Sequence, residues 1–330
     1  MDDLQPPDIV RLTYVELTVT DLVRAREFWV DLLGLHVTEE STSSIWLRGY
    51  AEAIHHNVVL TEAEQAACAS IGFRVRSEAD LDRALDWFGA RGCRTLDLPA
   101  GSRVGAGRTV RVEDPLGFTL DFVFDMDKVE RLLRRWDLYR GAQIARIDHV
   151  NVVVPDAQAA HDLYAELGFG LAETIESSDH LYAAWMFRKP TVHDIAFTEG
   201  TGPPLHHIGF DVGERTNILD LADVIAARNL TCVERGPGRH GVSAAFYLYM
   251  LDPDEHRAEI YTTDYFTGDP DFEPLRWDVE DPRRRDYWGG HVAQSFFTDA
   301  SPVHDLDGEE VKTADPGHAG ETVVGADGLG

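Results

Sequence analysis

The chain lacks the features that would place it outside the cell or in a membrane. It has only three cysteines, Cys68, Cys93 and Cys232, without metal-ligand spacing or evident pairing, as is typical of a reducing compartment. The N-terminal stretch lacks the basic start and apolar core of a signal peptide. No apolar run approaches the ~20 residues that a membrane-spanning helix requires. We therefore expect a cytoplasmic protein without membrane contact.

Basic residues are also scarce. The 330 residues contain 30 Lys and Arg against 58 Asp and Glu, which gives a formal net charge of -28. Such a charge repels phosphate backbones, so nucleic acid is not an expected partner, and a small anionic ligand would need a local basic pocket. The hydrophobic content of 44% is typical of a globular chain long enough for two domains with cores of their own.

The sequence repeats itself in three places, always in the same order. The stretch TYVELTVTDLVRAREFWVDLLGL from Thr13 matches DHVNVVVPDAQAAHDLYAELGF from Asp148, and each predicts a strand followed by an amphipathic helix. SIGFRV at Ser70 matches HIGFDV at His207, and RVEDPLGFTLDFVF from Arg111 matches YMLDPDEHRAEIYT from Tyr249. Three matches in register indicate a duplicated unit.

Each half divides again into two weaker repeats that read strand, helix and three strands. The predicted fold is therefore α+β, with tandem βαβββ modules that form two domains, each an open cup of mixed sheet, and a C-terminal lid. We expect an N-terminal domain over residues 1–130, a charged helical linker over 131–146 and a C-terminal domain over 147–265. The Pro-, Asp- and Trp-rich residues 266–297 predict the lid, and the Gly- and Asp-rich residues 298–330 predict a mobile tail.

The duplication lets each position of one half be compared with its counterpart in the other. His149 aligns with Tyr14, His207 with Ser70 and Glu259 with Asp121, so only the C-terminal half holds two histidines and a glutamate together. Neighbouring residues on a strand face opposite sides, so only one of His206 and His207 should face the cup, and the repeat favours His207. Two imidazoles and one carboxylate from separate strands suit Fe(II), with Mn(II) as an alternative.

Simpler explanations exist for each residue. A single histidine on a half-buried strand is more often a hydrogen-bonded core residue than a ligand, and no short motif such as His-x-x-x-His is present. The three arginines from Arg283 onward would ordinarily be a solvated surface run. In so acidic a chain they can also form the local basic pocket, because a guanidinium group fits a carboxylate.

HGVSAAFYLYMLDPDEHRAEIY, from His240, resembles the signature of the type I extradiol ring-cleaving dioxygenases of the vicinal oxygen chelate superfamily. DHVNVVV, ERGPGRHGVSAAFYLYMLDPD and DYFTGDPDFEPLRWDVEDPRRRDYWG further resemble the branch of that family that acts on homoprotocatechuate, 3,4-dihydroxyphenylacetate. The resemblance is close from about Arg146 to Ser295 and looser before. It implies a metal-free N-terminal domain, a catalytic C-terminal domain and a homotetramer.

The resemblance also implies a role for particular residues. His149, His207 and Glu259 take the places of the metal ligands, in agreement with the repeat, and the implied cofactor is Fe(II), with Mn(II) as the alternative. His193, whose repeat counterpart is His56, takes the place of the acid/base histidine, and Tyr249 that of a tyrosine that hydrogen-bonds the catechol. The remaining pocket positions, some of them near the substrate carboxylate, fall on Asn151, Trp185, Arg235, His240, Arg284 and Arg285.

The implied reaction is extradiol cleavage of a catechol by dioxygen. With 3,4-dihydroxyphenylacetate as substrate it yields the yellow 5-carboxymethyl-2-hydroxymuconate semialdehyde. Three alternatives stay open: a dioxygenase for another catechol, a glyoxalase-like enzyme that uses a metal but no dioxygen, and a non-catalytic binding protein of the same fold. Glyoxalase-like enzymes usually take their metal ligands from both modules of a paired site, whereas this chain has its candidate ligands in one half. Binding proteins of this fold lack the metal ligands.

Overall fold

The computed structural model describes residues 4–316, and within them four βαβββ modules follow one another along the chain. The first two modules form the N-terminal domain. The first consists of β1 (Ile9–Val19), α1 (Leu22–Arg26) continued by a π-helical turn (Glu27–Leu32), β2 (His36–Glu40), β3 (Ser44–Arg48) and β4 (Val58–Glu62). The second consists of β5 (Ala67–Val75), α2 (Ala79–Gly89), β6 (Thr95–Leu98), β7 (Thr109–Glu113) and β8 (Thr119–Val123).

The other two modules form the C-terminal domain and repeat the same order. The third consists of β9 (Ile144–Val154), α3 (Ala157–Glu166), β10 (Gly170–Glu176), β11 (Leu181–Phe187) and β12 (Ile195–Glu199). The fourth consists of β13 (Pro204–Val212), α4 (Arg215–Ala227), β14 (Val233–Arg239), a 3-10 turn (Val242–Ala244), β15 (Phe246–Leu251) and β16 (Arg257–Thr262). The predicted fold class, with tandem modules and mixed sheets, is confirmed.

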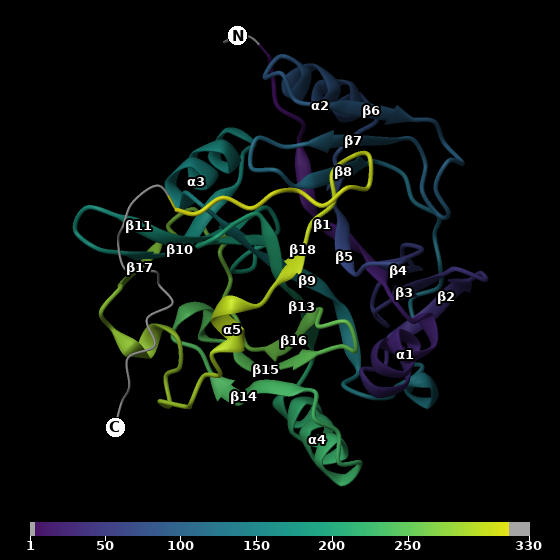
Figure 1. Ribbon diagram of the computed structural model, residues 1–330, viewed down its shortest axis with the longest axis vertical. Helices are drawn as coiled ribbons and strands as arrows, with labels where there is room; N and C mark the ends of the chain where they lie inside the picture. Colours follow the sequence, from purple (N-terminus) through teal and green to yellow (C-terminus); the bar gives the residue numbers. More distant parts are fainter. Residues whose placement is uncertain (1–3, 317–330) are drawn as a thin grey trace.

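In each domain the first strands of the two modules pair antiparallel at the centre of one sheet. The N-terminal sheet has the order β2-β3-β4-β1-β5-β8-β7-β6. The C-terminal sheet has the order β14-β15-β16-β13-β9-β12-β11-β10-β17, in which β17 (Leu275–Asp278) comes from the chain after the fourth module. Helices α1, α2, α3 and α4 pack on these sheets, and the two domains lie side by side with α3 near the N-terminal sheet (Figure 1). Buried apolar side chains from both sheets and their helices form one continuous core.

The two domains contact each other through a reciprocal pair of hydrogen bonds. Trp29, on the first helix of the N-terminal domain, donates from its indole Nε1 to Asp252 Oδ2 at 2.9 Å. Tyr164, at the matching place of α3, donates from its hydroxyl to Asp114 Oδ2 at 3.4 Å. The two acids are the counterparts that begin the Asp-Pro turns between the last two strands of each domain. The turn of each domain therefore docks on the first helix of the other.

The linker differs from the expectation of a helix. Within residues 131–146 the only regular helix is the 3-10 turn Trp136–Leu138, and β9 already begins at Ile144. The backbone N–H of Leu132 donates to the carbonyl oxygen of Tyr50 at 2.8 Å. Arg134 adopts a φ of 71°, which a helix does not permit. Contacts with the N-terminal domain thus replace the local helical hydrogen bonds that the sequence pattern favours.

The chain after residue 265 runs along the open side of the C-terminal cup and then back over both domains. It contains β17 (Leu275–Asp278), which pairs with β10, the 3-10 turn Pro282–Arg284, α5 (Ser295–Thr298) and β18 (Ser301–Pro302). Beyond β18 the yellow chain crosses in front of β5 and β8 (Figure 1), where the backbone N–H of His304 donates to Cys68 O at 3.0 Å. Residues 298–316, expected to be mobile, therefore make defined contacts with both domains; the rest of the expected tail, 317–330, lies outside the described residues.

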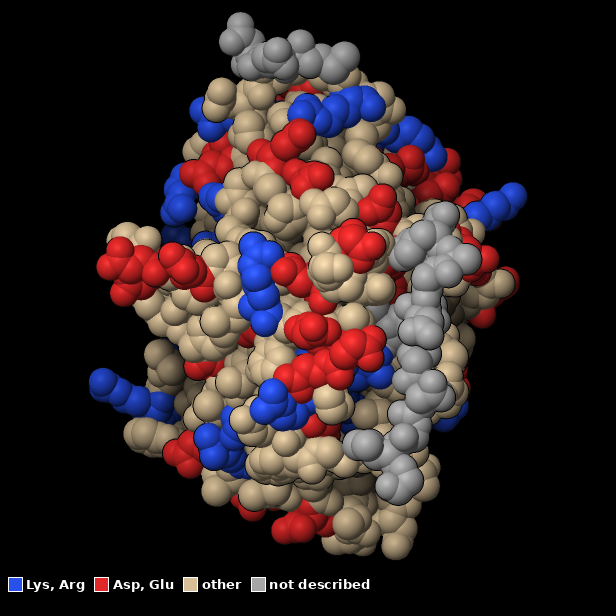
Figure 2. Space-filling view, turned by 90° about the vertical axis from the view of Figure 1, so that its left-hand side faces the viewer, with Lys and Arg blue, Asp and Glu red and all other residues tan. Residues whose placement is uncertain are grey.

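Charge on the surface follows the composition. Figure 2 shows clusters of acidic side chains over one face, with basic residues as separate groups between them. Within residues 4–316, no helix is both long and apolar enough to cross a membrane.

Candidate metal centre and substrate pocket

The central strands of the C-terminal sheet bring the three expected ligands together. In the pairing of β9 with β13, Gly209 lies opposite His149 and His207 lies opposite Asn151. In the pairing of β13 with β16, Gly209 lies opposite Glu259. One potential ligand atom from each of His149, His207 and Glu259 therefore falls within 4.8 Å of the others, and all three residues are buried.

Gly209 makes this approach sterically feasible. A Cβ atom at this position would lie 2.2 Å from Cε1 of His149, far inside van der Waals contact. A larger residue would therefore push the imidazole away from Glu259, across the strand. The glycine of the HIGF motif is thus required by the ring of His149, which uses the space that a side chain would fill.

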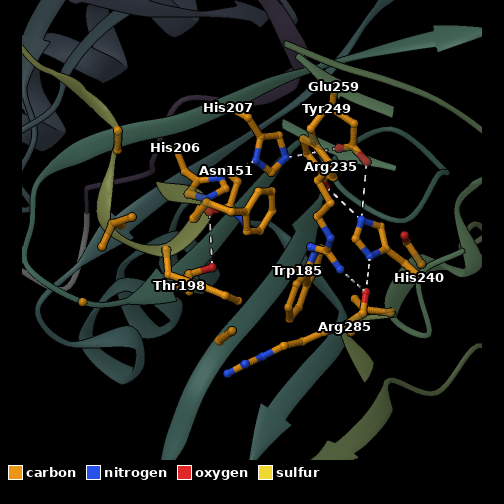
Figure 3. A pocket seen from close by; sticks show the side chains of 18 of the residues that line it. Asn151, Trp185, Thr198, His206, His207, Arg235, His240, Tyr249, Glu259 and Arg285 are labelled. Atoms are coloured by element: carbon orange, nitrogen blue, oxygen red, sulfur yellow. Dashed lines mark hydrogen bonds and ion pairs between the residues drawn. The ribbon is translucent and has the colours of Figure 1, made fainter. Parts of the chain in front are cut away.

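The nitrogens of both histidines face the same carboxylate oxygen. Nε2 of His149 lies 2.9 Å from Oε2 of Glu259, and Nε2 of His207 lies 3.2 Å from that atom. Figure 3 shows His207 and Glu259 pointing toward one another at the wall of the cavity.

Hydrogen bonds on the far side of each ring fix which nitrogen carries the proton. Asp148 Oδ2 accepts from Nδ1 of His149 at 3.1 Å, which leaves Nε2 to face Glu259. Nε2 of His206 can only donate to the carbonyl oxygen of Phe296 at 2.8 Å, so its Nδ1 accepts from Nδ1 of His207 at 2.6 Å. Both Nε2 lone pairs thus converge on a buried carboxylate, an arrangement that a divalent cation stabilises.

The protonation of the ligands supports the same conclusion. Burial alone would lower the pKa of His149, but its hydrogen bonds to Asp148 and Glu259 raise that pKa to about 9. Burial would raise the pKa of Glu259, yet the surrounding histidines hold it well below its usual value. A positive charge is therefore favoured at the centre, supplied either by a proton on His149 or by a metal ion. The donor set of two imidazoles and one carboxylate fits Fe(II) and Mn(II).

A cavity of about 520 Å³ opens in front of the three ligands. Its walls come from strands β9, β11, β13, β15 and β16, and its outer side comes from the lid and α5. Every further residue that the sequence singled out lines it, namely Asn151, Trp185, His193, Arg235, His240, Tyr249, Arg284 and Arg285.

Several of these side chains have buried polar atoms without a hydrogen-bond partner among the described residues. They are Nδ1 of His193, Nε of Arg235 and Nε of Arg284. The ring of His193 lies 3.9 Å from that of His149, between centroids, so its imidazole is beside the metal centre. Burial lowers the pKa of His193 well below its usual value, so its imidazole is neutral and able to accept a proton. The arginines that line the cavity indicate an anionic ligand.

Tyr249 and His240 form a short chain of hydrogen bonds beside Glu259. His240 Nδ1 donates to the carbonyl oxygen of Arg285 at 2.6 Å, so its Nε2 accepts from the hydroxyl of Tyr249 at 2.9 Å. Nε2 of His240 is also 3.7 Å from Oε1 of Glu259. Figure 3 shows Glu259, Tyr249 and His240 grouped at one end of the cavity, with Arg285 beyond them. The second sphere of the metal centre is therefore linked to the lid.

Two residues of the site were missed by sequence reasoning. His206 also lines the cavity and supports His207, although strand alternation predicted that only one of the pair faces inward; a register shift between Leu205 and His207 in the β9 pairing explains the difference. Tyr261 lines the cavity, with its ring 5.1 Å from that of His149 between centroids. Tyr261 could have been predicted, because residues two apart on a strand face the same side and Tyr261 follows Glu259 by two residues on β16.

Comparisons with known proteins agree with the fold. The model of the Glyoxalase/Bleomycin resistance protein/Dioxygenase superfamily matches residues 11–122 and 146–260, so the chain belongs to this superfamily. A manganese-dependent 2,3-dihydroxybiphenyl 1,2-dioxygenase of Geobacillus genomosp. 3 is 30% identical to it, over 86% of this chain and 94% of that protein. A metapyrocatechase of Geobacillus stearothermophilus is 27% identical, over 90% of this chain and 94% of that protein.

Among solved structures, homoprotocatechuate 2,3-dioxygenase from Brevibacterium fuscum is similar over nearly the whole chain. Its anaerobic complex with 3,4-dihydroxyphenylacetate has a TM-score of 0.93 and 49% sequence identity, covering 94% of this chain and 98% of that one. A room-temperature structure of an extradiol ring-cleaving dioxygenase from the same organism gives a TM-score of 0.95 at 47% identity, covering 98% and 90%. The expected family is therefore confirmed, and the relatives and structural neighbours named here are dioxygenases.

Proposed function

We propose that the protein cleaves 3,4-dihydroxyphenylacetate beside its two hydroxyl groups, using dioxygen, to give 5-carboxymethyl-2-hydroxymuconate semialdehyde. The observation that carries the proposal is the convergence of His149, His207 and Glu259 at the end of a cavity that arginines also line. The similarity to a homoprotocatechuate dioxygenase that binds this catechol supports the choice of substrate.

His149, His207 and Glu259 would hold the metal ion, Fe(II) or alternatively Mn(II). When bound, the ion lowers the pKa of the catechol hydroxyls, brings catechol and dioxygen together and passes electron density between them. Three protein ligands leave room for both substrates. Asp148 and His206 keep the two imidazoles in the orientation and tautomer that binding requires.

His193 is placed to move the proton. Its neutral imidazole lies against His149 and lines the cavity, so it can accept a proton from a catechol hydroxyl beside the metal centre. The same imidazole can return that proton to the oxygen that becomes part of the product. Tyr249, whose hydroxyl proton is donated to His240, would accept a hydrogen bond from the other catechol hydroxyl and orient the ring.

The arginines at the outer end of the cavity would bind the acetate arm. Arg235 is buried, and its guanidinium carbon lies 4.9 Å from the ring centroid of Tyr247 and 4.6 Å from that of Phe296, which restricts its position. Arg284 is also buried, with an unpartnered Nε. A carboxylate needs such buried cationic donors in a chain with a net charge of -28.

One aerobic assay tests the proposed activity. Fe(II)-loaded protein mixed with 3,4-dihydroxyphenylacetate should consume one dioxygen per catechol and form a yellow product. The same assay with plain catechol and 2,3-dihydroxybiphenyl separates the proposed substrate from that of other extradiol dioxygenases. If no catechol consumes dioxygen while iron is bound, the dioxygenase function is wrong.

Substitution of two neighbouring arginines, Arg284 and Arg283, tests whether the arginines bind the acetate arm. Arg284→Ala should raise KM for 3,4-dihydroxyphenylacetate by about ten- to a hundredfold, the loss of a buried charge-assisted hydrogen bond, and change KM for plain catechol little. Arg283→Ala is the matched control, because Arg283 is exposed and pairs with Asp281 at 2.6 Å. Equal losses for both catechols would contradict a carboxylate role for Arg284.

Two alternatives for the function keep specific tests. A glyoxalase-like enzyme would turn over a thiol adduct without dioxygen uptake, and a binding protein would bind a ligand without needing Fe(II). The ligands come from both modules of the C-terminal domain, His149 from the third and His207 and Glu259 from the fourth, so it is the similarity to dioxygenases that favours the dioxygenase. Anaerobic titration with Fe(II), followed by a colour change on addition of catechol, distinguishes a metal-dependent enzyme from a binding protein.

We also propose a homotetramer in the cytoplasm. Large apolar side chains of the linker are exposed, among them Leu133 at 50% and Trp136 at 72%, and covering them in an assembly would remove apolar surface from water. The cysteines Cys68, Cys93 and Cys232 are free, which suits a reducing compartment. Light scattering after size-exclusion chromatography measures the mass; a monomer would contradict the tetramer.

A further inference from the structure

Glu173 is a buried carboxylate that the proposed chemistry does not use. It lies in the middle of β10 and is only 1% exposed. Its Oε1 accepts a hydrogen bond from the backbone N–H of Ser243 at 2.6 Å and another from the hydroxyl of Tyr265 at 2.5 Å. Its Oε2 accepts from the indole Nε1 of Trp277 at 2.7 Å. Three short charge-assisted hydrogen bonds offset the cost of burying the charge.

The three donors come from three separate segments around the cavity. Ser243 belongs to the turn Val242–Ala244 between β14 and β15, and Val242 and Ser243 line the cavity. Tyr265 stands at the start of the lid. Trp277 lies on β17, the lid strand that pairs with β10 at the edge of the sheet. One carboxylate therefore ties the cavity turn and two points of the lid to the sheet.

The backbone of the turn Val242–Ala244 is strained, so the hydrogen bond from Ser243 to Glu173 helps to hold it in place. Ser243 and Ala244 have φ values of 60° and 54°, a left-handed conformation that costs free energy for residues other than glycine. Val242 packs in a small apolar cluster with Ile175 and Ala183, against which Trp185 and Trp277 also pack. A shift of this turn would therefore move Val242 and Trp185, which both form the cavity wall.

We propose that Glu173 is a positioning residue that anchors the lid and the turn Val242–Ala244 over the substrate pocket. The proposal rests on the proposed function for its kinetic consequence, although the anchoring itself does not depend on it. Glu173 touches neither the ligand residues nor the arginines of the acetate pocket by any hydrogen bond among the described residues. Its effect on catalysis would therefore come through the shape of the cavity.

Glu173→Gln is the direct test. A glutamine has a single acceptor oxygen and an amide N–H that would face donors, so at least one of Ser243, Tyr265 and Trp277 would lose its partner. KM for 3,4-dihydroxyphenylacetate should rise about tenfold while kcat stays within about twofold, because binding geometry is lost and the metal centre is intact. Iron content should equal that of the wild type.

Hydrogen exchange gives a readout that is independent of activity. In Glu173→Gln, exchange should increase in peptides covering residues 240–245 and 265–278, and it should stay unchanged in β9 and β13. Tyr265→Phe, which removes one donor and leaves the carboxylate, should give a smaller change in the same peptides. The double variant should be no worse than Glu173→Gln alone, because both substitutions remove the same interaction.

Glu176→Gln is the matched control. Glu176 lies on the same strand and pairs with the same lid strand through Arg276 at 2.7 Å, but that pair is exposed to solvent and should contribute little. Exchange in Glu173→Gln that matches this control would overturn the proposal, and so would an equal increase throughout β9 and β13. If neither wild type nor variant cleaves any catechol, the proposed function fails, and the exchange data still decide the anchoring.

Discussion

Equivalent strand positions of the two domains hold different side chains around the same backbone. In the N-terminal sheet Gly72 lies opposite Tyr14 on one side and Asp121 on the other, just as Gly209 lies between His149 and Glu259. A Cβ atom at Gly72 would come within 2.6 Å of the ring of Tyr14. The glycine and the close ring are therefore present in both domains, with or without a metal centre.

The domains differ in how they neutralise the buried acid. Asp121 accepts from Nε of Arg111 at 2.7 Å, from the hydroxyl of Tyr14 at 2.9 Å and from that of Ser70 at 2.8 Å, and Arg103 is a second cation beside it. Burial would raise the pKa of Asp121, but the two arginines lower it.

Arg111 lies opposite Asp121 as Tyr249 lies opposite Glu259, so an arginine stands where the other domain has a tyrosine. A buried carboxylate requires a positive partner or several hydrogen-bond donors. The N-terminal domain supplies arginines from its own sequence, whereas the carboxylate of Glu259 lies against His149, His207 and His240. The comparison shows that the acid is common to both domains and that the choice of partner decides between a salt bridge and a metal centre.

Removal of the acid should therefore have opposite consequences in the two domains. Glu259→Gln should reduce bound iron, measured by elemental analysis, to the background level and abolish dioxygen uptake, because the anionic ligand is lost. Asp121→Asn should keep the iron but lower the free energy of unfolding by about 3–5 kcal/mol, since Arg103 and Arg111 lose a buried partner. Wild-type iron in Glu259→Gln would contradict the ligand assignment.

The acid/base histidine gives a second contrast. His193→Phe should keep iron and catechol binding but lower kcat by about 10²–10⁴, because His193 is a neutral imidazole against His149 that is not itself a ligand and can carry the proton. His56→Phe is the control, because His56 is its repeat counterpart and its ring lies 5.0 Å from that of Tyr14, between centroids. Stopped-flow measurement of substrate binding and product formation separates the two steps. Equal rates for wild type and His193→Phe would remove His193 from the mechanism.

Much of this architecture could be predicted because the repeat supplies an internal alignment. The four modules and the slots of His149, His207 and Glu259 follow from strand period and register alone. The inward position of His206 could not be predicted, because it depends on a register shift in the pairing with β9. The linker was wrongly expected to be helical, because its hydrogen bond from Leu132 to the N-terminal domain is a tertiary contact. The partners of Glu173 lie 70 to 104 residues away, beyond any local pattern.

The smallest expected effect concerns the two hydrogen bonds between the domains, from Trp29 to Asp252 and from Tyr164 to Asp114. In Asp252→Asn the amide has one oxygen where the carboxylate had two. Its NH2 group would therefore face either the indole N–H of Trp29 or the backbone N–H groups that Oδ1 now accepts from, and none of these can accept a hydrogen bond. The free energy of unfolding should fall by about 1–3 kcal/mol. Asp114→Asn should cost less, because the hydroxyl of Tyr164 can accept from the new amide.

Asp114 also predicts a dependence on pH. Burial raises its pKa to about 7, and backbone hydrogen bonds only partly oppose this. Because the folded-state pKa lies above the unfolded value of ~3.9, the contribution of Asp114 to stability is present below pH ~4 and is lost as the pH rises through about 7. Asp114→Asn should therefore lose stability less steeply than the wild type in denaturant titrations between about pH 4 and pH 7, which are the limits of this window. Parallel pH profiles for Asp114→Asn and the wild type would contradict a raised pKa of Asp114.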